Sequence, residues 1–189
     1  MNDKVKLGVI GVGGMGSLHV RDIAGMPNVQ LAAVCDVQPE RADRIGGQYA
    51  VTAYYNYQEM LEKADLDGVV IATPHYDHTP ISIAALQRGT HVLVEKPIAV
   101  HVKDAKKMID AYYAAKIRHA NLVFAIMFQN RTYGLWQKIK NLIDEGEVGR
   151  LVRATWIITS WFRSQFYYDN GGWRATWKGE GGGVLLNQC

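Results

Sequence analysis

Residues 5–16 read VKLGVIGVGGMG, an apolar run that leads into a glycine-rich turn. Gly11, Gly13 and Gly16 have the G-x-G-x-x-G spacing. Between a strand and a helix, the first glycine permits the tight turn, the second lets the backbone approach a pyrophosphate, and the third lets the helix pack closely on the strand. Phosphates would meet free N–H groups at the positive end of the helix dipole. The stretch therefore predicts a dinucleotide-binding turn.

An acidic residue follows the next apolar run. Residues 31–35 read LAAVC and end at Asp36, which lies 20 residues beyond Gly16, about where the dinucleotide fingerprint has its carboxylate. A carboxylate there accepts hydrogen bonds from both hydroxyls of an adenosine ribose and repels a 2′-phosphate, which favours NAD over NADP. The alternative is that Asp36 merely ends a strand. Arg41 keeps NADP possible, because an arginine can stack on adenine or pair with a 2′-phosphate.

Strand and helix signals alternate through the first two thirds of the chain. Further apolar runs of strand length occur at residues 68–72, 91–94 and 122–127. Helical segments are expected at residues 39–49, 57–63, 79–88 and 102–117. Continuously apolar strands separated by helices indicate a parallel sheet that is covered on both faces. We therefore expect a doubly wound α/β fold, with a dinucleotide-binding Rossmann domain over residues 1–127.

The composition changes near residue 128, since all five tryptophans follow that point. Their size favours a role in a core or an interface over a platform that stacks on carbohydrate. Residues 134–145 have helical spacing, and residues 151–161 are rich in β-branched and aromatic residues, which predicts a long strand. Glycine-rich loops are expected at 169–172 and 179–183. One strand does not make a sheet, so we expect residues 128–189 to be an incomplete second domain.

Composition excludes several classes of protein. The net charge of +3, without a long basic run, gives no reason to expect a nucleic-acid partner. The two cysteines, Cys35 and Cys189, exclude a disulfide framework or a cysteine-based metal site and fit a reducing cytoplasm. The chain has no apolar signal core, and no apolar run approaches the roughly 18 residues that span a bilayer, so no membrane partner is expected.

In open α/β sheets, ligands bind outside the carboxyl ends of the strands. The residues that follow the expected strands are the glycine turn, Asp36, Thr73-Pro74-His75, Glu95-Lys96-Pro97 and Gln129-Asn130-Arg131. Lys96 is the main candidate for chemistry, because a lysine in this crevice can orient a substrate hydroxyl or exchange its proton. The alternative is that the Glu-Lys pair belongs to a solvated loop.

Residues 75–78 read HYDH, and two histidines with a carboxylate could suggest a metal site. No further ligand cluster accompanies them, and the segment stands where a cofactor floor and a helix N-terminus are expected. We therefore expect no metal, with Asp77 capping the helix.

With these motifs in this order, the chain resembles the Gfo/Idh/MocA oxidoreductases. The resemblance rests on the glycine turn, Thr73-Pro74 followed by His78, Glu95-Lys96-Pro97, Trp173-Arg174 and the triple glycine at 181–183. It implies a Rossmann domain that binds NAD or NADP, followed by an α+β open-faced sheet domain. That second domain would bind a sugar, an inositol or a related polyol and form homo-oligomer contacts.

The resemblance also implies site residues. The cofactor contacts would be Gly11, Val12, Gly13, Gly14, Met15, Gly16, Asp36, Val37, Arg41, Thr73, Pro74, His75, His78, Glu95, Lys96, Trp173 and Arg174. Lys96 would be the catalytic residue, facing both nicotinamide and substrate. Further substrate contacts are expected from Gln129, Arg131 and Asn187.

One departure from the family concerns the proton acceptor. In many members an Asp follows the triple glycine and a His comes four residues later as the acid/base. Here Asn187 stands at the Asp position, and the chain ends at Cys189, before the His position at 191. We therefore expect this 189-residue chain to bind dinucleotide weakly or not at all and to turn over no polyol.

The function expected for the intact protein is hydride transfer between nicotinamide and a sugar, inositol or related polyol. Two alternatives stay open. One is a regulatory protein that kept the dinucleotide fold and lost its chemistry, which Asn187 would support. The other is a transferase or lyase that uses bound NAD transiently.

Overall fold

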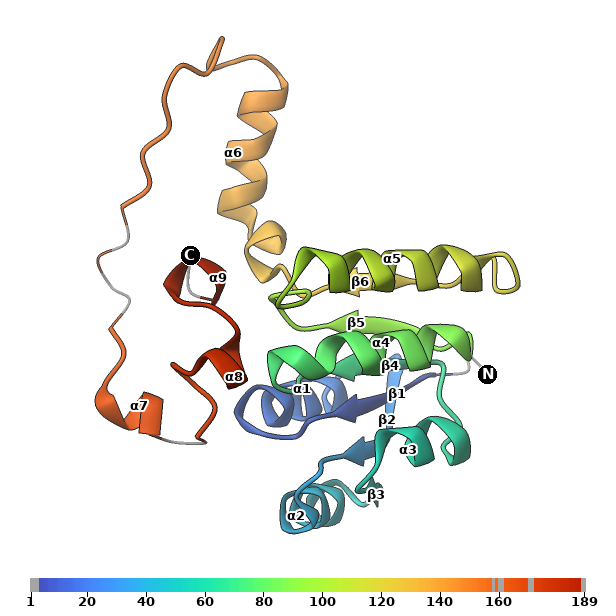
Figure 1. Cartoon of the computed structure of the whole chain (residues 1–189). Helices are drawn as coiled ribbons and strands as arrows, with labels where there is room; N and C mark the ends of the chain where they lie inside the picture. The colour runs from blue at the N-terminus through green and yellow to red at the C-terminus, as the bar shows by residue number, and fades with distance from the viewer. Residues whose placement is uncertain (1–3, 158, 160–161, 170–171, 188–189) are drawn as a thin grey trace. The chain divides into compact units, whose positions relative to one another are not determined.

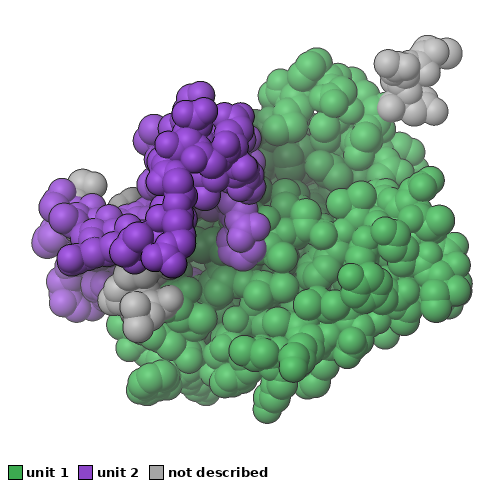
Figure 2. Space-filling view, turned by 90° about the horizontal axis from the view of Figure 1, so that it is seen from above, with its two compact units in different colours: residues 1–127, 175–189 green, residues 128–174 purple. Residues whose placement is uncertain are grey.

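A computed structural model of the chain (Figure 1) describes residues 4–157, 159, 162–169 and 172–187. The described residues belong to two compact units, which Figure 2 colours separately. Unit 1 draws on residues 1–127 and 175–189, and unit 2 on residues 128–174. The short stretch after residue 174 therefore belongs to the same unit as the N-terminal part of the chain.

Among the described residues, unit 1 contains one parallel sheet with the strand order β3-β2-β1-β4-β5-β6. Its strands are β1 (Val5–Ile10), β2 (Val29–Cys35), β3 (Thr52–Tyr54), β4 (Gly68–Ile71), β5 (His91–Val94) and β6 (Phe124–Ile126). The order reverses at β1, which lies between β2 and β4. This doubly wound arrangement confirms the predicted Rossmann fold.

Helices cover both faces of the sheet (Figure 1). They are α1 (Gly14–Ala24), α2 (Pro39–Tyr49), α3 (Tyr57–Lys63), α4 (His78–Gln87) and α5 (Val102–Lys116). Val20 and Ile45 place α1 and α2 in one buried cluster with Val70 of β4. Residues from α3, α4 and α5 share the other cluster with Val69 and Ile71. Neighbouring residues of β4 thus point to opposite faces, as a strand buried on both sides requires.

The glycine turn between β1 and α1 depends on two glycines for steric reasons. Gly11 has a φ of +85°, which side chains rarely adopt, and a Cβ there would lie 2.8 Å from the carbonyl carbon of Ala72. A Cβ on Gly16 would lie 1.7 Å from the carbonyl oxygen of Gly11. The turn and the first turn of α1 can therefore pack this closely only without side chains at both positions.

Two short helices follow residue 174 in unit 1, where the sequence suggests only a glycine loop. They are α8 (Trp177–Glu180) and α9 (Val184–Asn187). The hydroxyl of Thr176 accepts a hydrogen bond from Gly179 N at 3.0 Å, which caps α8, and Gly181 ends it with a φ of +76°. The predicted loop at 179–183 is thus wrong at its start and right at the triple glycine.

In unit 2 the expected helix is present, and no described residue of the expected strand at 151–161 is in a strand. The helical segments are η2 (Gln129–Thr132), α6 (Gly134–Asp144) and α7 (Gln165–Asp169). Residues 151–157 and 159 have no regular secondary structure, while 158, 160 and 161 lie outside the described residues. A strand needs a neighbour for its N–H and C=O groups, and no described residue of unit 2 is in a strand. Trp156 instead stacks on Trp136, with ring centroids 4.7 Å apart.

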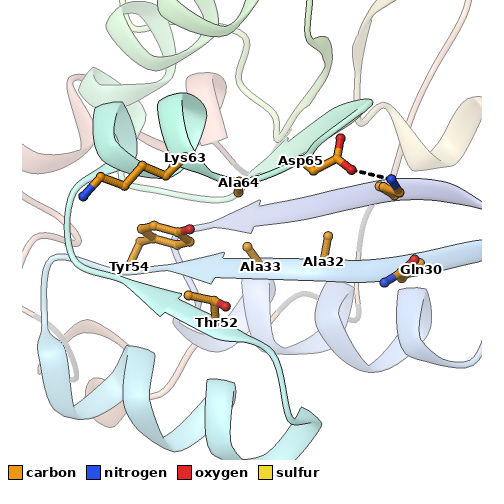
Figure 3. A pocket seen from close by; sticks show the side chains of 9 residues that line it. Gln30, Ala32, Ala33, Thr52, Tyr54, Lys63, Ala64 and Asp65 are labelled. Atoms are coloured by element: carbon orange, nitrogen blue, oxygen red, sulfur yellow. Dashed lines mark hydrogen bonds and ion pairs between the residues drawn. The ribbon is translucent and has the colours of Figure 1, made fainter.

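An open hollow of about 340 Å³ lies along β2 and β3, beside the end of α3 (Figure 3). Gln30, Ala32 and Tyr54 line it, and an ion pair between Lys6 and Asp65 stands at its side. None of its lining residues is an expected site residue. No helix among the described residues is long and apolar enough to cross a bilayer.

The turn geometry gives a stability prediction. Gly16→Ala forces a Cβ into the Gly11 carbonyl and should lower the free energy of unfolding by at least about 2 kcal/mol, within the range for overpacking. Gly47→Ala in α2 is the matched control, because a Cβ there meets nothing within 4 Å. It should stabilise the helix by roughly 0.5–1 kcal/mol. Urea unfolding of both variants checks this, and equal effects would contradict the packing account.

Candidate active site

The hydrogen-bond ladder of the sheet continues past the ends of the strands. Gly11 N donates to Cys35 O at 2.7 Å, and Glu95 N donates to Ile71 O at 2.9 Å. Asp36 N is held in the same way by a carbonyl of β3. The first residues after β1, β2 and β5 are therefore fixed at one edge of the sheet, which is where open α/β sheets bind ligands.

The glycine turn has room for phosphate. A Cβ on Gly14 would meet nothing within 4 Å, and one on Gly13 would meet only Arg41 Nη1, at 3.7 Å. Gly13 is the N-cap of α1, and no side chain makes a capping hydrogen bond there. The first turn of the helix, at the positive end of the helix dipole, therefore has open space beside Gly14 and no side-chain cap. These residues fit the pyrophosphate of a dinucleotide.

Asp36 is buried and connects β2 to the glycine turn. Its Oδ2 accepts from Val12 N at 3.0 Å, and its Oδ1 accepts from Gln38 N at 3.0 Å. Arg41 Nη1 lies 3.3 Å from Oδ2, so the two residues form an ion pair in this structure. Val37 is 85% exposed beside them and presents no charge. A ribose that bonds to Asp36 would compete with Arg41, whose side chain lies partly in solvent.

His78 connects two of the segments that follow strands. Its Nδ1 lies 2.8 Å from Pro97 O, and its Nε2 lies 3.0 Å from Thr73 O. The ring is completely buried, and burial is the main cause that lowers the pKa of His78, while the two carbonyls act in the opposite direction. A neutral imidazole has one N–H, so it donates to one of these two carbonyls and lies against the other, between Thr73-Pro74 and Lys96-Pro97.

Asp77 precedes α4 but does not cap it in the expected way. It stands at the N-cap position and makes no side-chain capping hydrogen bond. Burial raises the pKa of its carboxyl. Within the described part of the chain, no group of three or more His, Cys, Asp or Glu side chains could hold a metal ion.

Glu95 and Lys96 make separate sets of contacts. Glu95 Oε1 lies 2.8 Å from Nε2 of His19 in α1, and its Oε2 accepts from Lys96 N at 3.1 Å. The Lys96 ammonium donates to Asn187 O at 2.8 Å and to Asn187 Oδ1 at 3.1 Å. The structure thus brings Lys96 and Asn187 together, as expected of two residues of one site.

Two residues that the sequence patterns do not single out bond to expected site residues. His19, three residues beyond Gly16, connects the glycine-turn helix to Glu95. Glu180, directly before the triple glycine, is buried and accepts a hydrogen bond from the amide nitrogen of Asn187. The placement of His19 one helical turn after the motif is the only sequence signal for either residue.

The remaining predicted site residues belong to unit 2. Gln129 and Arg131 are exposed residues of η2. The guanidinium of Arg174 lies over the rings of Tyr167 and Trp173, 4.3 and 4.5 Å from their centroids. Their roles toward cofactor or substrate stay predictions, as do those of the unit 1 residues.

Two models of known protein families match the chain. Residues 5–120 match a family described as an oxidoreductase family with an NAD-binding Rossmann fold, and residues 136–189 match the GFO/IDH/MocA C-terminal domain. The chain belongs to the Gfo/Idh/MocA oxidoreductase family. The resemblance inferred from the motifs is confirmed, and the Gfo/Idh/MocA chain contains the family's NAD-binding domain and the start of its C-terminal domain.

Its relatives in sequence include enzymes of two kinds. It is 32% identical to an inositol 2-dehydrogenase of Salmonella typhimurium over 149 residues, 77% of this Gfo/Idh/MocA chain and 43% of the relative. It is 29% identical to a protein of Shewanella sp. named glycosyl hydrolase family 109 protein, over 97% of this chain and 42% of the relative.

Its structural relatives include complexes with cofactor. The WlbA dehydrogenase of Bordetella pertussis, solved with NADH and UDP-GlcNAcA, has a TM-score of 0.86 and 30% identity over 98% of this chain and 54% of that one. Scyllo-inositol dehydrogenase of Lactobacillus casei, solved with NAD(H) and scyllo-inositol, has a TM-score of 0.69 and 30% identity over 78% and 43%. The Gfo/Idh/MocA chain thus spans about half the length of these relatives.

The lowered pKa of His78 predicts a pH dependence of stability. Folded His78 stays neutral at a pH where the unfolded ring, with a pKa near 6.5, takes up a proton. Its stabilising contribution is present above pH 6.5 and is lost as the pH falls below that value, by about 1.4 kcal/mol per unit of pKa shift. The free energy of unfolding, measured at pH 7.5 and 5.5, should therefore fall less on acidification in His78→Gln than in the wild type. The exposed His101→Gln should match the wild type, and a wild-type slope in His78→Gln would contradict the prediction.

Proposed function

We propose that the protein transfers a hydride between NAD and the carbinol carbon of a sugar, an inositol or a related polyol. The observation that carries the proposal is the position of Lys96. Lys96 is the second residue after β5, in the segment at the same sheet edge as the open glycine turn, and Glu95 beside it bonds to His19 of α1. Two of the named relatives, the inositol 2-dehydrogenase and the scyllo-inositol dehydrogenase, are dehydrogenases by name, which supports the substrate class.

In this proposal the cofactor is held by residues of unit 1. The N–H groups at Gly13 and Gly14 would bind the pyrophosphate, and Asp36 would accept hydrogen bonds from the adenosine ribose. Thr73 and Pro74 would floor the site, and Glu95 would lie near the nicotinamide ribose. When bound, NAD supplies the acceptor for the hydride.

Lys96 would act on the substrate oxygen. Oxidation of an alcohol removes a hydride from carbon and a proton from oxygen, so the site needs a donor that holds the oxygen and a group that accepts the proton. The Lys96 ammonium provides the donor. The Asn187 amide cannot accept the proton at neutral pH, so we assign it to orienting Lys96 and substrate. In the intact protein the proton would go to the His that the family resemblance implies at position 191.

We further propose that residues 1–127 form the cofactor domain and residues 128–189 belong to a domain for substrate and homo-oligomer contacts. Gln129, Arg131, Trp173 and Arg174 would then act from the second domain. Exposed apolar side chains of unit 2 support this, since Leu135, for example, is 67% exposed.

Two other functions have support. A regulatory dinucleotide-binding protein is supported by Asn187, which accepts hydrogen bonds from the Lys96 ammonium and cannot act as an acid or base at neutral pH. A glycoside-cleaving enzyme is supported by the relative named glycosyl hydrolase family 109 protein, since NAD-dependent glycosidases exist. A panel of inositols, sugars, nucleotide sugars and glycosides with NAD and NADP separates the three. NADH formation indicates the dehydrogenase, binding without turnover the regulatory protein, and release of the aglycone the glycoside-cleaving enzyme.

Lys96→Ala tests the role of the lysine in the full gene product. The turnover number with the best substrate of the panel should fall roughly 10²- to 10⁴-fold, because a positioned donor that holds and polarises the substrate oxygen is lost. NADH formation at saturating NAD gives the rate. Lys103→Ala, an exposed lysine of α5, should keep wild-type turnover. Equal rates in Lys96→Ala and the wild type would refute the assignment.

Asp36→Asn tests cofactor choice. In the full gene product, the wild type should bind NADH more tightly than NADPH, and the variant should lose about tenfold in NADH affinity because a charge-assisted hydrogen bond is replaced by a neutral one. Fluorescence titration gives both dissociation constants, with the exposed Asp110→Asn as control. Tighter NADPH binding by the wild type would contradict the predicted preference for NAD and would assign Arg41 to binding a 2′-phosphate.

A further inference from the structure

The Asn187 side chain that contacts Lys96 also bonds to a buried carboxylate. Glu180 is the last residue of α8 and is 6% exposed. Its Oε1 accepts a hydrogen bond from Asn187 Nδ2, and its Oε2 accepts from Ala175 N at 2.9 Å. Both oxygens act as acceptors, so this geometry suits the ionised carboxylate.

We propose that Glu180 is a positioning residue for Lys96 and that it acts through the side-chain amide of Asn187. The inference rests on the proposed function of Lys96. In this proposal Glu180 acts on the lysine through that amide and has no assigned contact with substrate or cofactor.

The chemistry of the three groups explains how the positioning works. An amide has an oxygen that accepts and an NH₂ that donates, and its two orientations have nearly the same shape. The Lys96 ammonium can only donate and the Glu180 carboxylate can only accept. One orientation of Asn187 satisfies both neighbours, with Oδ1 toward Lys96 and Nδ2 toward Glu180. The carboxylate therefore excludes the flipped amide, which would turn its NH₂ toward the ammonium.

Glu180 also fixes where the amide stands. Its backbone carbonyl lies 2.9 Å from Nδ1 of the buried His75, so this nitrogen carries the proton and donates. The next residue, Gly181, packs so closely on Val100 that a Cβ there would lie 2.1 Å from Val100 Cγ1. The segment that carries Glu180 is thus attached to the loops that follow β4 and β5. A carboxylate held from both sides can hold Asn187 in turn.

Replacement of Glu180 by glutamine tests the inference. The variant keeps the size of the side chain but has one acceptor oxygen and one NH₂, so it cannot accept from both Ala175 N and Asn187 Nδ2. Asn187 should then lose its preferred orientation, and the Lys96 amine should become freer to react. In the full gene product, the acetylation rate of Lys96 by an N-hydroxysuccinimide ester, followed by mass spectrometry, should rise about fivefold, the effect of one lost hydrogen bond. The rate of Lys103 in the same sample is the internal reference.

Asn187→Ala distinguishes positioning through the amide from a general structural role. This variant should raise the Lys96 rate as Glu180→Gln does, and the double variant should be no faster than Asn187→Ala alone. The exposed Glu62→Gln is the matched control and should leave the rate unchanged. An unchanged Lys96 rate in folded Glu180→Gln, or effects that add in the double variant, would overturn the inference. If Glu180→Gln fails to fold, Glu180→Asp, which keeps the charge on a shorter side chain, serves the same comparison.

The readout separates this inference from the proposed function. NADH affinity should stay at the wild-type value in Glu180→Gln, while the turnover number falls and is not restored by more substrate. If Lys96 reactivity responds but no variant or wild type turns over any substrate, the positioning stands and the proposed function fails. If turnover is measured and Lys96 reactivity does not respond, the proposed function stands and Glu180 has no part in it.

Discussion

The parallel ladder of the sheet is the constraint on which the site depends. In a parallel sheet all carboxyl ends lie at one edge, and here the backbone bonds continue one residue past the strands, as in Gly11 N to Cys35 O and Glu95 N to Ile71 O. These bonds therefore hold the neighbouring residues in nearly fixed positions. Because the strand order reverses at β1, the chain diverges on either side of the glycine turn and leaves it open.

Polar side chains then connect the loops that the sheet has brought to this edge. Asp36 holds the glycine turn through Val12 N, and Glu95 holds α1 through His19. His78 joins the loops after β4 and β5, with its pKa lowered by the burial that this position imposes. The open parts of the edge, at Gly13 and Gly14, are those without such partners. The edge therefore combines loops that are fixed by hydrogen bonds with an open glycine turn that can bind an anion.

The sequence predicted those features whose cause is local. Gly16 is required by a contact within its own turn, and the apolar runs of β1 and β4 follow from burial on both faces. Glu180 could not be found in this way, because it meets His75 across 105 residues of chain. The strand expected at 151–161 is wrong for the described residues 151–157 and 159 for a related reason, since β-branched and aromatic residues form a strand only beside a partner strand. The three residues of β3 carry no apolar run and gave no signal.

The central claim is that the glycine turn and the Lys96 amine belong to one site. A crystal structure of the full gene product with NADH and a bound polyol tests it most directly. The account predicts the pyrophosphate against Gly13 and Gly14, and a substrate hydroxyl within hydrogen-bond reach of Lys96 Nζ, roughly 2.6–3.2 Å. A dinucleotide bound away from the glycine turn, or a substrate with no oxygen near Lys96, would contradict it.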